Sequence, residues 1–203
     1  MPKEGDPLTK AEVALIVRWI EEGAKDDTPA NANSFKLKEP PTYRRPPVIS
    51  ALAFSPEGKQ LAVSGYHVVL VHSAGESNIL ARLVGESPRV ESIAYSPNGK
   101  FIGVAGGAPS LFGEVQLWST ESNALVRSIK SSIDSLYGIS FAPDSDKVAV
   151  GGADKSVRVF SVSDGKELMK FDNHSDWVFG TTFLVDGKRM LSGSRDKAMK
   201  LIN

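Results

Sequence analysis

The sequence contains no cysteine among its 203 residues. Disulfide bonds, thiolate metal sites and a cysteine nucleophile are therefore excluded. An excess of charge of either sign is also missing, because 24 basic residues balance 24 acidic ones. Without a basic stripe or an acidic block, we expect no nucleic-acid partner.

Long apolar runs are missing as well. The longest, Ala11 to Ile20, is interrupted by Glu12 and Arg18, whereas a membrane span needs about 20 apolar residues. The N-terminus lacks the apolar core and small-residue cleavage site of a signal peptide. We expect no membrane partner and no signal peptide in this chain, and its localisation stays unknown.

Signatures of catalysis and of bound cofactors are absent too. The sequence has neither the phosphate loop Gly-x-x-x-x-Gly-Lys-Ser/Thr nor the nucleophile elbow Gly-x-Ser-x-Gly. His67 and His72 stand five residues apart, a spacing that places them on opposite faces of a strand. No carboxylate–histidine cluster has the spacing of metal ligands. We predict no enzyme, with no catalytic residue, metal site or cofactor in this chain.

The first feature that is present is a helix. Thr9 and Glu12 have the spacing of a capping box, and Gly23 offers a C-terminal stop. Between them the apolar residues recur with helical spacing, at Val13, Ile16, Val17 and Ile20. This pattern predicts that residues 10–22 form the only substantial helix. Residues 26–47 carry five prolines and are predicted to be an extended linker.

From Val48 onward the sequence repeats itself. The segment Phe54-Ser-Pro-Glu-Gly-Lys-Gln-Leu61 recurs three times, with its aromatic position taken by Tyr95, Phe141 and Phe183. These positions lie 41, 46 and 42 residues apart (95−54, 141−95 and 183−141). A constant period in this range indicates stacked units of supersecondary structure. The units are predicted at 48–86, 87–134, 135–176 and 177–203, the last one incomplete.

Within each unit the pattern alternates with the period of two that is typical of β-strands. Strands are predicted near 48–54, 60–64, 67–72 and 78–84 and in the equivalent segments of the later units. Four short antiparallel strands in about 42 residues fit one blade of a β-propeller. The predicted fold is therefore all-β, a partial propeller of about four blades with one N-terminal helix.

Two further expectations concern the interior of the repeats. The four aromatic anchors Phe54, Tyr95, Phe141 and Phe183 should occupy equivalent places on the first strands, packed between sheets. The glycine pairs Gly106-Gly107 and Gly151-Gly152 are expected to form tight turns between strands rather than phosphate sites. The longer second unit is attributed to an insertion at 108–113.

The motifs of these units resemble those of WD-repeat propellers over residues 48–203. Leu117-Trp118-Ser119 resembles the end of that family's third strand, with Ser119 in place of the usual Asp. Asn173-His174 resembles the Gly-His before a first strand. The resemblance implies a buried hydrogen-bonded set in the fourth unit from His174, Ser192 and Asp196, with Ile202 in the Trp place. These three residues and Trp118 are therefore expected to be structural.

Residues 1–25 resemble a different family, the end of a bacterial c-type cytochrome domain. The resemblance rests on Met1-Pro2, Leu8-Thr9 and the segment from Trp19 to Ala24. It implies that Met1 is a candidate axial haem ligand in a longer parent protein, which would then be periplasmic. Covalent haem attachment needs Cys-x-x-Cys-His, so this chain itself is expected to hold no haem. Met1 as a plain initiator residue is the simpler interpretation.

Two functions follow from these observations. The first is a propeller scaffold that mediates protein–protein interaction, in a chain that is a fragment of a larger protein because about four blades leave both ends uncovered. The alternative is the docking part of a cytochrome–propeller fusion in electron transfer. Leu111 and Phe112, in the inserted loop, either form an exposed contact or fold back onto the blade. The protein partner cannot be named from the sequence.

Overall fold

The computed structural model describes residues 9–23, 48–76 and 78–203. The helix and the strand array are separate units of structure, and each is described by itself. Met1 and the linker predicted at 26–47 lie outside the described residues. The helix of residues 10–22 and the strands from residue 48 onward can therefore be compared with the structure.

The helix α1 spans Lys10–Glu21 and begins at the predicted capping box. The Thr9 Oγ1 accepts from the Glu12 backbone N–H at 3.3 Å, and Glu12 Oε2 accepts from the Thr9 N–H at 2.7 Å. Gly23 follows the C-cap with a φ of 90°, the left-handed conformation that ends helices. Among the described residues, no helix is long and apolar enough to cross a membrane.

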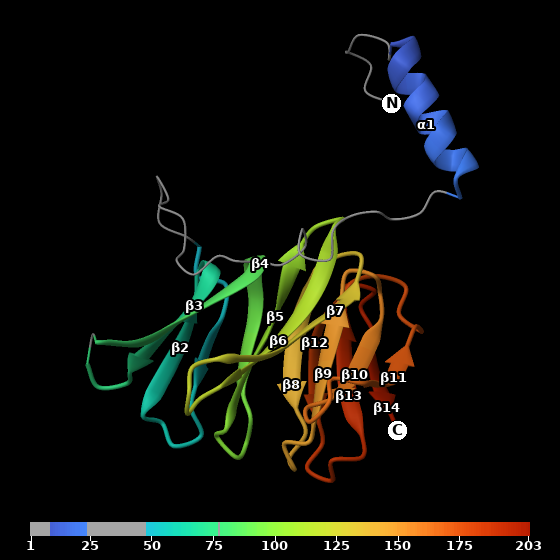
Figure 1. The fold of residues 1–203 in the computed structure, drawn as a ribbon. Helices are drawn as coiled ribbons and strands as arrows, with labels where there is room; N and C mark the ends of the chain where they lie inside the picture. Colours follow the sequence, from blue (N-terminus) through green and yellow to red (C-terminus); the bar gives the residue numbers. More distant parts are fainter. Residues whose placement is uncertain (1–8, 24–47, 77) are drawn as a thin grey trace. The chain divides into compact units, whose positions relative to one another are not determined.

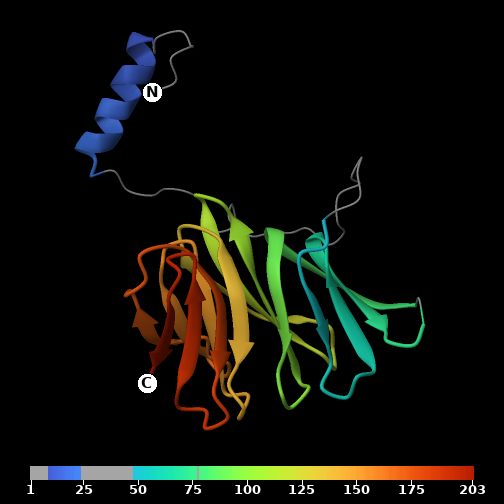
Figure 2. The same cartoon turned by 180° about the vertical axis from the view of Figure 1, so that it is seen from behind.

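The rest of the described chain forms three antiparallel sheets, of seven, four and three strands. We number four blades: blade 1 is 52–84, blade 2 is 89–132, blade 3 is 136–171 and blade 4 is 178–202. They follow one another in chain order, face against face (Figures 1 and 2). The strands are β1 (Leu52–Phe54), β2 (Gln60–Ser64), β3 (Tyr66–Ser73), β4 (Ile79–Tyr95), β5 (Phe101–Ala108), β6 (Phe112–Ser119), β7 (Leu125–Ser132), β8 (Leu136–Phe141), β9 (Lys147–Gly152), β10 (Val157–Ser161), β11 (Glu167–Phe171), β12 (Val178–Phe183), β13 (Met190–Ser194) and β14 (Met199–Ile202).

One strand is longer than the repeat pattern predicts. The fourth strand of blade 1 runs without a break into the first strand of blade 2, so that β4 covers both. Its first half pairs with β3 and its second half with β5. The boundary predicted between residues 86 and 87 therefore falls inside a strand, which continues through Gly85 and Pro88.

The repeat register is the same in every blade. Each aromatic anchor pairs with the residue seven positions later, across the turn between the first and second strands: Phe54 with Leu61, Tyr95 with Ile102, Phe141 with Val148, and Phe183 with Met190. In three of these turns a short polar side chain accepts from the backbone N–H two residues on, at Asn98, Asp144 and Asp186. The anchors therefore occupy equivalent places, as predicted.

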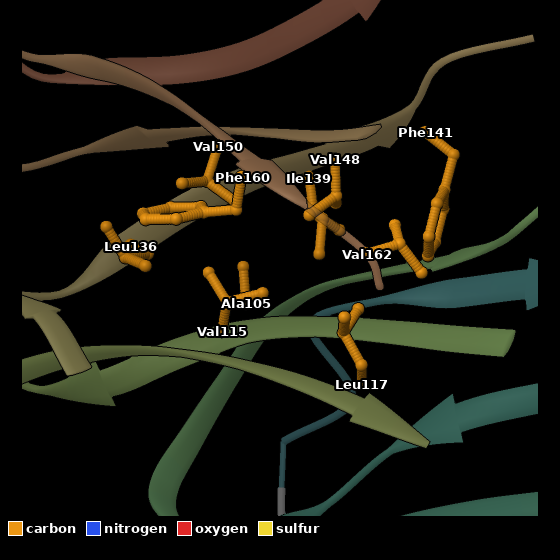
Figure 3. Packing of buried hydrophobic residues seen from close by; sticks show 10 residues of the cluster. All are labelled: Ala105, Val115, Leu117, Leu136, Ile139, Phe141, Val148, Val150, Phe160 and Val162. Atoms are coloured by element: carbon orange, nitrogen blue, oxygen red, sulfur yellow. The ribbon is translucent and has the colours of Figure 1, made fainter. Parts of the chain in front are cut away.

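The hydrophobic core lies between consecutive blades, in three clusters. The one between blades 2 and 3 is formed by Ala105, Val115 and Leu117 on one side and residues such as Ile139 and Phe160 on the other (Figure 3). A second cluster joins blades 1 and 2 and contains Trp118, and the third joins blades 3 and 4. Alternate residues of each blade thus face the preceding and the following blade.

The prediction that all four anchors are packed between sheets is wrong for Phe54. Phe141 is only 8% exposed, but Phe54 is 62% exposed. Tyr95 and Phe183 pack partly buried against their clusters. Each anchor faces the preceding blade, and no described residue provides a blade before β1. Position in the array, rather than position in the repeat, therefore decides whether an anchor is buried.

The glycine pairs do not form turns, contrary to the prediction. Gly106 and Gly107 lie in β5, and Gly151 and Gly152 lie in β9. They are needed for close approach of neighbouring backbones: a Cβ on Gly106 would stand 2.0 Å from the carbonyl oxygen of Arg89. The insertion at 108–113 likewise lengthens the β5–β6 ladder, where Ala108 pairs with Phe112.

Gly138 and Gly151 of blade 3 make room for the first strand of blade 4. A Cβ on Gly138 would stand 2.6 Å from the carbonyl oxygen of Phe179, and one on Gly151 would stand 2.6 Å from Val178 Cγ1. Blade 4 repeats both glycines 42 residues later (180−138 and 193−151), as Gly180 and Gly193. A Cβ on either would meet no heavy atom within 4 Å.

Candidate interaction surface

The structure brings together the three predicted residues of blade 4. His174 Nδ1 lies 2.8 Å from Asp196 Oδ2, and its Nε2 lies 2.7 Å from Ser192 Oγ. Because a carboxylate only accepts, Nδ1 carries the proton of this pair. Asp196 also accepts from the backbone N–H groups of Ser175 and Ala198. The set thus ties the loop before β12 to the turn between β13 and β14.

Removing the charge of Asp196 is expected to destabilise the fold at neutral pH. Donation from the Ser175 N–H, with bonds from His174 and Ala198, holds the pKa of this carboxyl well below its usual range, against the opposing effect of burial. A lowered folded-state pKa contributes stability above the unfolded value of about 4, and this contribution is lost as pH falls through the folded value.

Urea unfolding of the wild type and of Asp196→Asn measures this effect. The wild type should have the higher midpoint at pH 7, and the difference should shrink steadily below about pH 4, where the carboxyl of the unfolded chain is protonated. Equal midpoints at pH 7 would show that the charge does not stabilise the turn. Asp176→Asn is the control, a carboxylate of the same loop region outside the set.

Trp118 belongs to a separate buried network in blade 2. Its indole Nε1 donates to Gln116 Oε1 at 3.0 Å, and Gln116 Nε2 donates to Glu114 Oε2 at 2.8 Å. Ser87 and Ser128 also donate to Glu114. These hydrogen bonds satisfy a carboxyl group that is almost completely buried. Alternation of Glu114, Gln116 and Trp118 on one face of β6 is the signal that could have identified this network in the sequence.

Blade 3 has a polar set of its own around Arg158. The guanidinium lies 2.7 Å from Asp154 Oδ2 and 3.4 Å from Glu167 Oε2. Burial tends to raise the pKa of Asp154, but hydrogen bonds from Arg158 and Ser156 lower it overall. Such satisfied groups are typical of structural networks. Among residues 9–23, 48–76 and 78–203, no group of His, Asp and Glu is arranged to hold a metal ion.

In the inserted hairpin, Leu111 and Phe112 differ in exposure, so that each fits one of the two predicted alternatives. Leu111, at the turn, is 74% exposed. Phe112 is half-buried at the start of β6, and the Lys130 ammonium lies 4.9 Å above the centre of its ring. Lys130 in turn pairs with Glu86 at 2.7 Å. Leu111 is thus available for contact, whereas Phe112 folds back onto the blade.

A larger exposed apolar feature lies where blades 3 and 4 begin. We call Tyr137, Trp177 and Phe179 the aromatic cluster. The ring of Tyr137 lies 5.6 Å from that of Trp177 and 5.3 Å from that of Phe179. Trp177 is 37% exposed and Phe179 is 50% exposed. These distances are in the range of attractive ring pairs, so the cluster is packed together and yet open to solvent.

The aromatic cluster is not among the residues predicted from the sequence, although the spacing of the repeats contains a signal for it. Tyr137 and Phe179 lie 42 residues apart (179−137), the spacing of their blades, and therefore occupy the same place in the repeat. The first two blades have Ser50 and Glu91 there (137−46 and 91−41). An aromatic side chain at this place is consequently not a requirement of the blade.

Two segments of this chain match a family model of WD repeats. The family model described as "WD domain, G-beta repeat" matches residues 123–161 and 165–203. The two matches begin 42 residues apart (165−123), which is the spacing of Phe141 and Phe183. Each match begins near the last strand of one blade and ends with the third strand of the next. The mostly β structure with antiparallel blades agrees with a partial WD propeller.

Several curated proteins are similar to part of the chain. The Intraflagellar transport protein 122 homolog of Xenopus tropicalis is 35% identical over 65 residues, 32% of this chain and 5% of the relative. The WD repeat and SOCS box-containing protein 1 of Homo sapiens is 27% identical over 93 residues, 45% of this chain and 22% of the relative. Its counterpart of the same name from Danio rerio is 28% identical over 91 residues, 44% of this chain and 22% of the relative. The similar segments thus span less than a quarter of each relative.

Proposed function

We propose that this chain is a scaffold for protein–protein interaction that binds its partner through the aromatic cluster. The observation that carries the proposal is the exposure of Trp177 and Phe179 at places where the repeat does not need aromatic side chains. Exposed aromatic groups that are packed together are typical of the residues that dominate binding energy at interfaces. The WD repeats support this function, because stacked repeats present extended surfaces for binding.

No catalytic function is proposed. The carboxylates and the histidine of the polar sets are engaged in hydrogen bonds inside the blades. We assign His174, Ser192, Asp196 and Trp118 a structural role on this basis. The scaffold needs no cofactor. The electron-transfer alternative, with Met1 as haem ligand in a longer parent, rests on the resemblance of residues 1–25 alone and gains no support from the matched family.

We also infer that the described blades are part of a longer array. The support comes from the glycines of blades 3 and 4. Gly138 and Gly151 of blade 3 allow the next blade to approach closely. Gly180 and Gly193 occupy the same places in blade 4, where no described blade packs against them. At the other end Phe54 faces outward from blade 1. Uncovered end faces are unfavourable in repeat proteins without caps. Further blades on both faces would bury them.

A selection from a display library of random linear peptides tests the proposed function. We expect the full chain to enrich peptides that lose at least about tenfold in affinity for the double variant Trp177→Ser with Phe179→Ser, because hot-spot residues contribute about 2 kcal/mol or more each. Serine is the residue that the chain itself carries at equivalent places, Ser135 and Ser50. The double variant should therefore fold.

Leu125→Ser provides the matched control, since Leu125 is an exposed apolar residue of β7 away from the cluster. Its affinity for the selected peptides, measured by fluorescence anisotropy, should equal that of the wild type. If no peptide is enriched, or if Leu125→Ser loses as much affinity as the double variant, the aromatic cluster is not a binding platform.

A further inference from the structure

The charges around the aromatic cluster are not balanced. Three carboxylates lie near it: Glu91 on β4 and Asp134 before β8 act on Tyr137, and Asp176 directly precedes Trp177. Two arginines accompany them, with Arg89 at 3.1 Å from Glu91 and Arg195 at 3.6 Å from Asp176. Asp134 is the carboxylate left over, and it accepts from the backbone N–H groups of Ser110 and Ser135.

The electrostatic potential at the centre of the cluster is consistent with this excess of negative charge. The pKa of the Tyr137 hydroxyl is raised, first by burial and then by the carboxylates of Glu91 and Asp134, which act on it more strongly than Arg89 and Arg195 do in the opposite direction. A site of negative potential attracts cations. The negatively charged faces of aromatic rings add to this attraction.

The chain itself places a cation on one of these rings. The guanidinium carbon of Arg195 lies 5.1 Å from the centre of the Trp177 ring, within the distance of a cation–π interaction. Within the described part of the chain, one long ion pair, to Asp176, holds the Arg195 side chain there, and this side chain is 58% exposed. A guanidinium from a partner could therefore displace it at low cost.

We infer that the aromatic cluster recognises an arginine side chain in an extended segment of a partner protein. Trp177 and Tyr137 offer ring faces on which a planar guanidinium stacks. Glu91, Asp134 and Asp176 supply the compensating charge, and Phe179 provides apolar contact for the methylene groups of the arginine. This inference rests on the proposed function and specifies the partner's chemistry.

The test uses a probe of minimal composition. An acetylated and amidated heptapeptide with one arginine among glycine and alanine residues is titrated into the full chain. Binding is followed by the NMR signal of the Trp177 indole N–H, which Trp177→Phe identifies. We expect a saturable shift with a millimolar dissociation constant, at least about fivefold weaker binding of the same peptide with neutral citrulline, and a further loss in high salt.

Three variants place the binding on the cluster. Tyr137→Leu and Trp177→Leu keep an apolar side chain and should each weaken peptide binding several-fold. Because Trp177→Leu lacks the indole signal, its binding is followed by the NMR signals of tyrosine residues. Arg195→Gln removes the internal competitor and one positive charge, so its affinity should rise about threefold. If Arg195 had only a structural role, Arg195→Gln would not raise the affinity for the peptide. Leu125→Ala should bind as the wild type does.

Several outcomes would overturn the inference. Equal binding of the arginine and citrulline peptides would show that charge is not recognised, and an unchanged or lower affinity of Arg195→Gln would show that the Trp177 face is not the site. In either case peptides selected by display could still bind through the cluster, so that the proposed function would stand. Failure of the selection as well would overturn both.

Discussion

Gly151→Val is expected to destabilise the protein by at least about 3 kcal/mol, because overpacking a close contact costs about 1–3 kcal/mol and more where backbone must move. The new Cβ would stand 2.6 Å from Val178 Cγ1 and 2.8 Å from the Val178 carbonyl oxygen. The backbone atom cannot give way without shifting β12 as a whole. Urea unfolding followed by circular dichroism measures the loss.

Gly193→Val is the matched control for this prediction. Gly193 occupies the same place in blade 4, and its Cβ would meet no heavy atom within 4 Å. Valine is favourable in strands, so the free energy of unfolding should change by less than about 0.5 kcal/mol. Equal losses in both variants would indicate that glycine is needed for backbone conformation and not for the approach of a neighbouring blade.

Phe141→Ala should reduce the free energy of unfolding by about 3–5 kcal/mol, the range for a buried aromatic residue whose removal leaves a cavity. Its ring packs between blades 2 and 3, where it faces Gly103 and belongs to the same cluster as Leu117 and Val162 (Figure 3). Phe54→Ala removes the same side chain from the same place in the repeat. Because Phe54 is largely exposed, its loss should cost less than about 1 kcal/mol.

Phe183→Ala should fall between these two variants. Phe183 is half-buried against the cluster that joins blades 3 and 4. Chemical denaturation of the three variants under one condition gives the order directly. If Phe54→Ala cost as much as Phe141→Ala, the outer face of blade 1 would be covered in solution, and the expectation that Phe54 contributes little to stability would be wrong.

Local features of this fold could be predicted from the sequence because local chemistry determines them. Thr9 and Glu12 form their capping box through groups three residues apart. The turns between first and second strands repeat because proline, glycine and short polar residues set their backbone angles. The pairing of each anchor with the residue seven positions later follows from these turns.

Features that depend on neighbouring blades could not be predicted in this way. The exposure of Phe54 depends on what precedes β1, which the repeat pattern does not contain. Considered within its own blade, Gly151 fits a turn, but its role depends on Val178 in the next one. The aromatic cluster joins side chains from two blades, and no spacing rule within one repeat brings Tyr137 next to Trp177.

The continuous strand β4 has a consequence for how the array opens. Arg89 pairs with Tyr66 on one side and with Gly107 on the other, so that blades 1 and 2 share one hydrogen-bonded ladder. Blades 3 and 4 are separate sheets. Amide protons exchange with solvent through cooperative local unfolding. The smallest part that opens by itself is therefore a single blade towards the C-terminus, but a pair of blades at the other end of the array.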